Sequence, residues 1–178
     1  MSATLFRVAV ITLSDRVSAG ERMDEGGKAI REMLDALPCA IIAQLVLPDE
    51  AQQLIAQLLT LADQERADLI LTTGGTGLSA RDVTPEATLA VIQRRVPGIE
   101  EALRAHGLNK TPFAMLSRAV VGVRGQTLII NLPGNPKGVR ESMEVLLPVL
   151  PHALKLLHEE RIADQEHNYH NGSSGKTE

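Results

Sequence analysis

The sequence is poor in cysteine and in aromatic side chains. Cys39 is the one cysteine among 178 residues, which excludes an internal disulfide and any zinc site built from several cysteines. Tryptophan is absent, and the aromatic residues are Phe6, Phe113 and Tyr169. Proteins that bind single-stranded nucleic acid stack the bases on several surface aromatics, so the sequence argues against that class.

An excess of basic charge and long apolar runs are also missing. Eighteen Lys and Arg residues stand against 22 Asp and Glu, for a formal net charge of −4, so we expect no nucleic-acid partner. No apolar stretch approaches the roughly 18 residues that a membrane span needs. Residues 1–4 and the short apolar run 8–13 do not resemble an export signal. We therefore expect a cytoplasmic protein that does not engage a membrane.

What the sequence does contain is an alternation of short apolar runs and longer amphipathic segments. This pattern predicts an α/β fold, with helices on both faces of a mostly parallel sheet and a short antiparallel hairpin about Gly125. The expected strands are residues 6–13, 40–47, 68–73, 119–123 and 127–132. The expected helices are residues 26–37, 51–63, 84–95, 97–106, 112–118 and 135–159.

Details of the pattern set further expectations. Residues 14–25 are expected to form a polar loop, and Thr84 is expected to cap the helix that Pro85 opens. Pro148 and Pro151 should kink or break the last helix. We expect residues 1–160 to form a single domain and residues 161–178, which are polar and rich in Gly and Ser, to form a flexible tail.

Polar and glycine residues follow four of the expected strands at their carboxyl ends. In an open α/β sheet, ligands bind at that edge, so we expect these turns to meet in one site. The four turns are Ser14-Asp15-Arg16, Pro48-Asp49-Glu50, Gly74–Gly77 with Arg81-Asp82 behind it, and Asn131–Lys137.

The glycines at 74, 75 and 77 let the backbone approach a ligand closely, and exposed amides in such a turn bind anions, most often phosphate. The alternative is a tight turn without a ligand. Residues 75–80 also fit the dinucleotide-binding pattern G-x-G-x-x-A. We reject that interpretation because the expected helix begins at Thr84, several residues too late.

Asp49 and Asp82 are candidate ligands for Mg²⁺, which prefers one or two carboxylates together with phosphate oxygens and water. Each has an ordinary alternative: Asp49 could cap a helix, and Asp82 could pair with Arg81. Their placement at one edge of the sheet favours the metal site.

The segment around Asn135 and Lys137 offers a second anion site, because free N–H groups and a positive helix end stabilise negative charge. The alternative is ordinary capping by Asn135 with an exposed lysine. Ser117 and Arg118 could add a phosphate contact, although an arginine at the end of a short helix is more often a solvated cation. We find no nucleophile with an adjacent base, so covalent catalysis is not predicted.

At these same residues the sequence resembles the MogA/MoaB family of molybdenum-cofactor biosynthesis proteins, and it looks closer to the MogA type. The resemblance runs from about Phe6 to about Glu159. It is carried by Ile11–Arg16, Val46–Glu50, Leu71–Gly77, Arg81–Thr88, Pro112–Arg118 and Ile130–Lys137.

The resemblance implies a three-layer α/β/α fold, a homotrimer and molybdopterin adenylyltransfer with ATP and Mg²⁺, followed by molybdate insertion with a partner protein. The family's two essential aspartates correspond to Asp49 and Asp82, which are the expected catalytic and metal-binding residues. The expected substrate and nucleotide contacts are Ser14, Arg16, Gly74, Gly75, Thr76, Gly77, Ser117, Arg118, Asn131, Pro133, Gly134, Asn135 and Lys137.

Two other functions remain open at this point. The chain could bind and deliver molybdopterin without chemistry, as a protein of the MoaB type, or it could be a trimeric interaction scaffold. The presence of both aspartates favours the enzyme.

Overall fold

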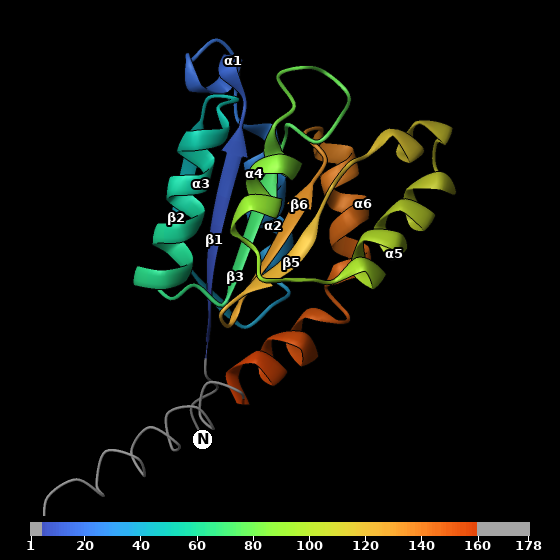
Figure 1. Ribbon diagram of the computed structural model, residues 1–178. Helices are drawn as coiled ribbons and strands as arrows, with labels where there is room; N and C mark the ends of the chain where they lie inside the picture. The colour runs from blue at the N-terminus through green and yellow to red at the C-terminus, as the bar shows by residue number, and fades with distance from the viewer. Residues whose placement is uncertain (1–4, 160–178) are drawn as a thin grey trace, which may run out of the picture.

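The computed structural model describes residues 5–159, which form a six-stranded sheet between two layers of helices (Figure 1). The expected tail at 161–178 lies outside the described residues. The strands are β1 (Phe6–Leu13), β2 (Cys39–Leu47), β3 (Leu69–Thr73), β4 (Arg94–Arg95), β5 (Val121–Arg124) and β6 (Thr127–Leu132). Their order is β2-β1-β3-β6-β5-β4. The first four strands in this order run parallel, and β5 and β4 are antiparallel to their neighbours. The expected α/β architecture with its hairpin is confirmed.

Among the described residues, helices α1 to α5 and two irregular helical segments connect the strands, and α6 follows β6. The helices are α1 (Asp15–Ser18), α2 (Glu25–Leu34), α3 (Ala51–Leu59), α4 (Thr84–Val91), α5 (Pro97–Leu108) and α6 (Pro136–Leu146). A π-helical segment, η1 (Thr60–Gln64), prolongs α3, and a 3-10 helix, η2 (Pro112–Leu116), follows α5. Residues 150–159 are helical as well. No helix among residues 5–159 is long and apolar enough to cross a membrane.

The core has two halves, one on each face of the sheet, because side chains along a strand alternate between the faces. Val8 and Val10 of β1 belong to the half under α2 and α6. Ala9 and Ile11, which alternate with them, belong to the half under α3 and α4. Both faces are therefore covered, and this explains why the central strands read as nearly continuous apolar runs.

The helix expected at 84–95 is wrong at its end. Helix α4 stops at Val91, and Arg94–Arg95 form β4, which pairs with β5. The N–H groups of Gln93 and Val96 donate to carbonyls of β5 on either side of this pairing. Pro97 also disfavours helical backbone at the preceding residue. A pairing with a strand almost thirty residues away thus overrides the local helical pattern.

Three smaller expectations also need correction. The expected loop at 14–25 contains α1, which Ser14 caps by accepting a hydrogen bond from Val17 N–H. Thr84 does not cap α4: its hydroxyl donates to the carbonyl of Gly74 at 2.8 Å. The last helix breaks around Pro148 as predicted, but Pro151 lies in the first turn of the next helical segment, where proline is tolerated.

Candidate functional site

The carboxyl ends of the parallel strands meet at one edge of the sheet, the upper edge in Figure 1, and two pockets open there. The first, of about 330 Å³, is called the acidic pocket and includes Ser14, Asp24, Glu25, Asp49, Gly74, Gly75 and Asp82 in its lining. The second, of about 400 Å³, is called the α5–α6 pocket and includes Thr76, Gly77, Lys110, Ser117, Asn131, Pro133, Lys137 and Glu141. Gly134 and Asn135 line both, so the two pockets adjoin.

The turn after β3 needs glycine for two physical reasons. Gly74 and Gly75 have φ values of +98° and +64°, which L side chains rarely adopt. A Cβ on Gly74 would also lie 2.2 Å from the carbonyl oxygen of Leu13, and one on Gly134 would lie 3.2 Å from the Cα of Gly74. Three turns from different strands therefore pack backbone against backbone and bring the expected site together.

Asp49 points into the acidic pocket and is held there by the turn after β1. Its Oδ2 accepts a hydrogen bond from the N–H of Asp15 at 2.9 Å, and its own N–H donates to Asp15 Oδ1 at 3.0 Å. The residue at the N-cap of α3 is Glu50, so Asp49 is not a helix cap. Burial raises the pKa of Asp49, and the negative charges of Asp15 and Asp82 raise it further against the backbone hydrogen bond that lowers it.

Asp82 lines the same pocket from the loop after β3. Its Oδ2 accepts a hydrogen bond from the N–H of Ser79 at 2.8 Å. Arg81 does not pair with it: the guanidinium binds both carboxylate oxygens of Asp15, at distances between 2.7 and 3.0 Å. That hydrogen bonding lowers the pKa of Asp15. Both ordinary alternatives for the two aspartates are thus excluded.

The donor set of the acidic pocket fits a magnesium ion carried by a phosphate ligand. Asp49 and Asp82 supply hard oxygen atoms, and a bound cation would stabilise the ionised form of Asp49, whose pKa is raised by burial first and then by the charges of Asp15 and Asp82. Within residues 5–159 no group of three or more His, Cys, Asp or Glu side chains could hold a metal. Mg²⁺ usually needs only one or two protein carboxylates, because substrate phosphates and water supply its remaining ligands.

The start of α2 also belongs to the acidic pocket, although its residues are not among the expected site residues. Asp24 caps the helix by accepting from Gly27 N–H at 2.8 Å, and Thr12 donates its hydroxyl to the same carboxylate. A Cβ on Gly26 would lie 2.8 Å from the Oγ1 of Thr73, so the helix start fits closely against the end of β3. The signal in the sequence is Asp24, a capping residue, followed closely by Gly26 and Gly27 in the first turn of the helix.

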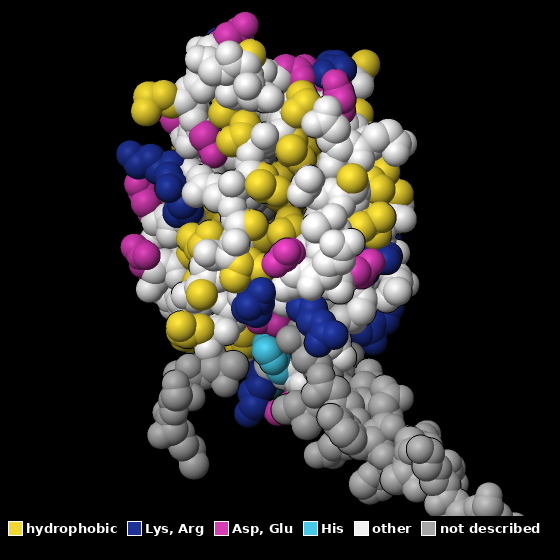
Figure 2. Space-filling view, turned by 90° about the vertical axis from the view of Figure 1, so that its left-hand side faces the viewer, with side chains coloured by type: hydrophobic (Ala, Val, Ile, Leu, Met, Phe, Trp, Pro, Cys, Tyr) yellow, Lys and Arg dark blue, Asp and Glu magenta, His cyan; other side chains and the backbone are white. Residues whose placement is uncertain are grey.

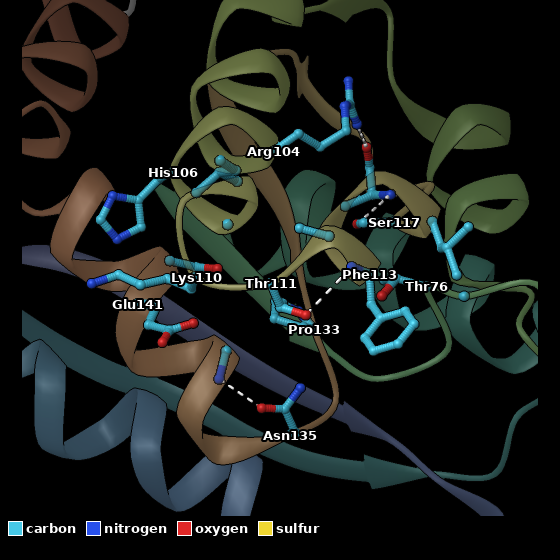
Figure 3. A pocket seen from close by; sticks show the side chains of 18 of the residues that line it. Thr76, Arg104, His106, Lys110, Thr111, Phe113, Ser117, Pro133, Asn135 and Glu141 are labelled. Carbon is cyan, nitrogen blue, oxygen red and sulfur yellow. Dashed lines mark hydrogen bonds between the residues drawn. The ribbon is translucent and has the colours of Figure 1, made fainter.

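The α5–α6 pocket gathers a second set of expected residues. Figure 3 shows Ser117 and Glu141 on opposite sides of this cavity, with Asn135 near its lower edge. Asn135 caps α6, because its Oδ1 accepts from Gly138 N–H at 2.7 Å. The ammonium of Lys137 is 3.9 Å from Glu141, and its side chain is 83% exposed. A cation beside a helix start suits an anionic group of a ligand.

For three other expected contacts the structure places the side chain in bonds within the protein or outside both pockets. The amide of Asn131 is buried and donates to the hydroxyls of Thr72 and Thr88, while its oxygen accepts from Val120 N–H. The Arg118 side chain is bonded within the protein, and Arg118 and the exposed Arg16 line neither pocket. Asn131 and Arg118 therefore hold the site's backbone, and neither is placed to donate its side chain to a ligand.

The chain matches a known protein family. The family described as "Probable molybdopterin binding domain" matches residues 9–152. The matched residues include Asp49, Asp82 and the turn at Gly134 and Asn135 that lines both pockets.

Curated relatives agree with this match. A gephyrin of Dictyostelium discoideum is 45% identical over 161 residues, covering 84% of this chain but only 22% of the relative. A protein of Helicobacter pylori named molybdopterin adenylyltransferase is 41% identical over 153 residues, covering 84% of this chain and 86% of the relative.

Solved structures confirm the fold. Figure 2 shows the face at the left of Figure 1, where hydrophobic side chains lie among polar and charged ones. A crystal structure of the molybdopterin biosynthesis enzyme MoaB from Thermus thermophilus superposes with a TM-score of 0.82 at 55% identity. The match covers 86% of this chain and 96% of the other. Relatives named molybdopterin adenylyltransferase and relatives named MoaB are thus both similar to this chain.

Proposed function

The chain belongs to the molybdopterin-binding domain family, and from this premise we propose that it is a molybdopterin adenylyltransferase, acting in molybdenum cofactor biosynthesis. The observation that supports this most strongly is that Asp49 and Asp82 line one pocket, which shares Gly134 and Asn135 with a second pocket. A nucleotide and a pterin bound in adjoining pockets would bring their phosphates together at the shared turn.

The acidic pocket suits the nucleotide. Asp49 and Asp82 would hold Mg²⁺ on the phosphates of ATP, and the backbone of Gly74 and Gly75 lines the same pocket beside them. When bound, the metal supplies a positive charge that offsets the charge on the reacting phosphates. The two carboxylates fix the position of that charge, which is what phosphoryl and nucleotidyl transfer chiefly require.

The α5–α6 pocket suits molybdopterin. Its wall carries apolar groups beside Ser117, Lys137 and Glu141, a mixture suited to a polar ring system with an anionic tail. Lys137 lies in the first turn of α6, where its charge and the helix end favour the pterin's phosphate. The shared turn would then present that phosphate to the nucleotide.

The reaction needs no covalent group from the protein. An oxygen of the terminal molybdopterin phosphate attacks the α-phosphorus of ATP and forms a new P–O bond. The bond between the α-phosphorus and the bridging oxygen breaks, and pyrophosphate leaves with that oxygen. The protein orients the two phosphates in line and neutralises their charge.

The test is to incubate the purified chain with molybdopterin and Mg-ATP and to follow pyrophosphate and the adenylylated pterin. We expect both products in equal amounts, and an Asp82→Ala variant that binds the pterin but forms neither. A wild-type chain that binds molybdopterin without releasing pyrophosphate would instead be a delivery protein of the MoaB type. A chain that binds no pterin would leave only the interaction scaffold.

The assembly and its setting are part of the same proposal. We propose a homotrimer in the cytoplasm that passes its product to a molybdate-inserting protein, because the family resemblance implies both. The side chains of Phe113 and Met115 are 74% and 63% exposed in the single chain, which leaves apolar surface for contacts between subunits. Light scattering of the purified protein tests the trimer directly.

A further inference from the structure

Arg118, which follows η2, is bonded to both ends of the loop that carries Asp82. Its Nε donates to the carbonyl of Gly77 at 2.6 Å, and its Nη2 donates to the carbonyl of Asp82 at 2.6 Å. Its Nη1 pairs with the carboxylate of Glu86 on α4. The backbone N–H of Arg118 adds a fourth bond, to the carbonyl of Thr76 at 2.9 Å.

The loop between these two anchored carbonyls, residues 77–82, has few apolar contacts, and its other tie to the rest of the protein is the ion pair of Arg81 with Asp15. Residues 78–81 are exposed, and the side chain of Leu78 is 66% exposed. Within the loop, Ser79 and Asp82 exchange two hydrogen bonds, at 2.8 and 2.9 Å. A surface loop with so few apolar contacts samples several conformations unless its ends are tied.

The planar guanidinium is suited to this task in a way that a lysine ammonium is not. Arginine presents its donors in a fixed fork, so it can bind two carbonyls and a carboxylate at once. Hydrogen bonding from Arg118 lowers the pKa of Glu86, so the carboxylate stays ionised and orients the fork. Arg118 itself lines neither pocket, so it reaches a ligand only through the loop.

We propose that Arg118 is a positioning residue, which fixes the metal-binding carboxylate of Asp82 by tying both ends of loop 77–82. This inference rests on the proposed role of Asp82 in holding Mg²⁺. The neighbouring Ser117 lines the α5–α6 pocket, so one short segment links the wall of that pocket to the metal-binding loop of the other. Because Arg118 acts through the position of Asp82, loss of its guanidinium should weaken Mg²⁺ binding more than it lowers kcat at saturating Mg²⁺.

The test compares full-length Arg118→Lys with a matched control, Arg124→Lys. Arg124 also forms a fork, to Asp63 and to the carbonyl of Val91, but lines neither pocket. Calorimetric titration of Mg²⁺ into protein holding α,β-methylene ATP measures metal affinity without turnover. We expect Arg118→Lys to weaken Mg²⁺ binding by about tenfold or more, as is usual when a group supporting a ligand is lost. In the pyrophosphate assay, kcat at saturating Mg²⁺ should stay near the wild-type value.

Arg124→Lys should leave Mg²⁺ affinity unchanged even if it lowers the melting temperature as much as Arg118→Lys does. Glu86→Gln, at an exposed position on α4, should also weaken Mg²⁺ binding, by a smaller factor than Arg118→Lys. If Arg118→Lys does not fold, this variant tests the proposal in its place. Equal Mg²⁺ affinity in both lysine variants, or a fall in kcat with unchanged Mg²⁺ dependence, would overturn the proposal. A wild-type chain that binds Mg²⁺ and nucleotide but releases no pyrophosphate would refute only the adenylyltransferase, since the titration still reports on Arg118.

Discussion

Asp15 and Asp49 exchange two hydrogen bonds, each donating its backbone N–H to the other's carboxylate, at 2.9 and 3.0 Å. The turns after β1 and β2 are locked together by this exchange, although the residues are 34 positions apart. Asp15 is neutralised by Arg81, whereas Asp49 keeps its second oxygen near Gly75, which also lines the acidic pocket. Asp15, held by Arg81, therefore fixes the orientation of the Asp49 carboxylate in the acidic pocket.

Asp49→Asn should make the metal-free protein more stable at neutral pH while it removes activity. Burial and neighbouring charges raise the pKa of Asp49 in the folded state, so its ionised form destabilises the fold. An asparagine oxygen can still accept from Asp15 N–H without that charge. We expect the melting temperature to rise by about 1–2 °C, a fraction of a kcal/mol for a chain of this length.

This gain should shrink as the pH falls through the raised pKa of Asp49, because the wild-type side chain then takes up a proton and loses its charge. Asp63→Asn is the control, since it removes the partner of Arg124 and should lower the melting temperature. A fall in melting temperature for Asp49→Asn at neutral pH would contradict the electrostatic account of this residue.

As the pH is lowered, Mg²⁺ affinity should begin to fall at a higher pH than it would at a site whose aspartate has an ordinary pKa. Asp49 must be deprotonated to bind the metal, and its pKa lies above the usual value, so protons compete at higher pH. Titration of Mg²⁺ with α,β-methylene ATP between about pH 5 and pH 8 measures this. In Asp49→Asn the remaining pH dependence should equal that of Mg²⁺ binding to the nucleotide alone.

Gly74→Ala should be strongly destabilising. The position has φ of +98°, and the new Cβ would lie 2.2 Å from a backbone oxygen that cannot rotate away. We expect a loss of about 2–4 kcal/mol in the free energy of unfolding, measured by urea denaturation. The matched change Gly98→Ala meets no atom within 4 Å and should be neutral or stabilising by up to about 1 kcal/mol.

Lys137→Ala should impair pterin binding without affecting stability. The side chain is 83% exposed, so its loss should change the free energy of unfolding by less than about 0.5 kcal/mol. The loss of one charged contact to a phosphate should raise KM for molybdopterin by about tenfold. Lys155→Ala, at a lysine that also pairs with a glutamate four residues on, should leave KM unchanged. An unaltered KM in Lys137→Ala would remove this residue from the site.

The parts of the fold that local pattern determines could be predicted from the sequence. β1, β3 and β6 were predictable because short apolar runs buried on both faces have few other structures open to them. The end of α4 was not, because Arg94 and Arg95 leave the helix for a partner strand whose position depends on the whole sheet. Likewise, the start of α2 joins the acidic pocket only once that helix has folded back against β3.

The same division applies to the site. The turns that hold Asp49 and Asp82 were predictable because parallel strands place their carboxyl ends at one edge. The internal roles of Arg118 and Asn131 were not, because a polar residue near a site can face either a ligand or the backbone. Arg118 finds its carbonyl partners 41 and 36 residues away, and no local signal identifies them.

The most direct test of the account is a double-mutant cycle on Asp49 and Asp82, with pyrophosphate release as the readout at saturating molybdopterin and ATP. If both carboxylates hold one Mg²⁺, each alanine variant should lose about a thousandfold or more in kcat, and the double variant should be no slower than the slower single variant. Losses that multiply in the double variant, or a single variant that keeps near-wild-type kcat, would contradict a shared metal site.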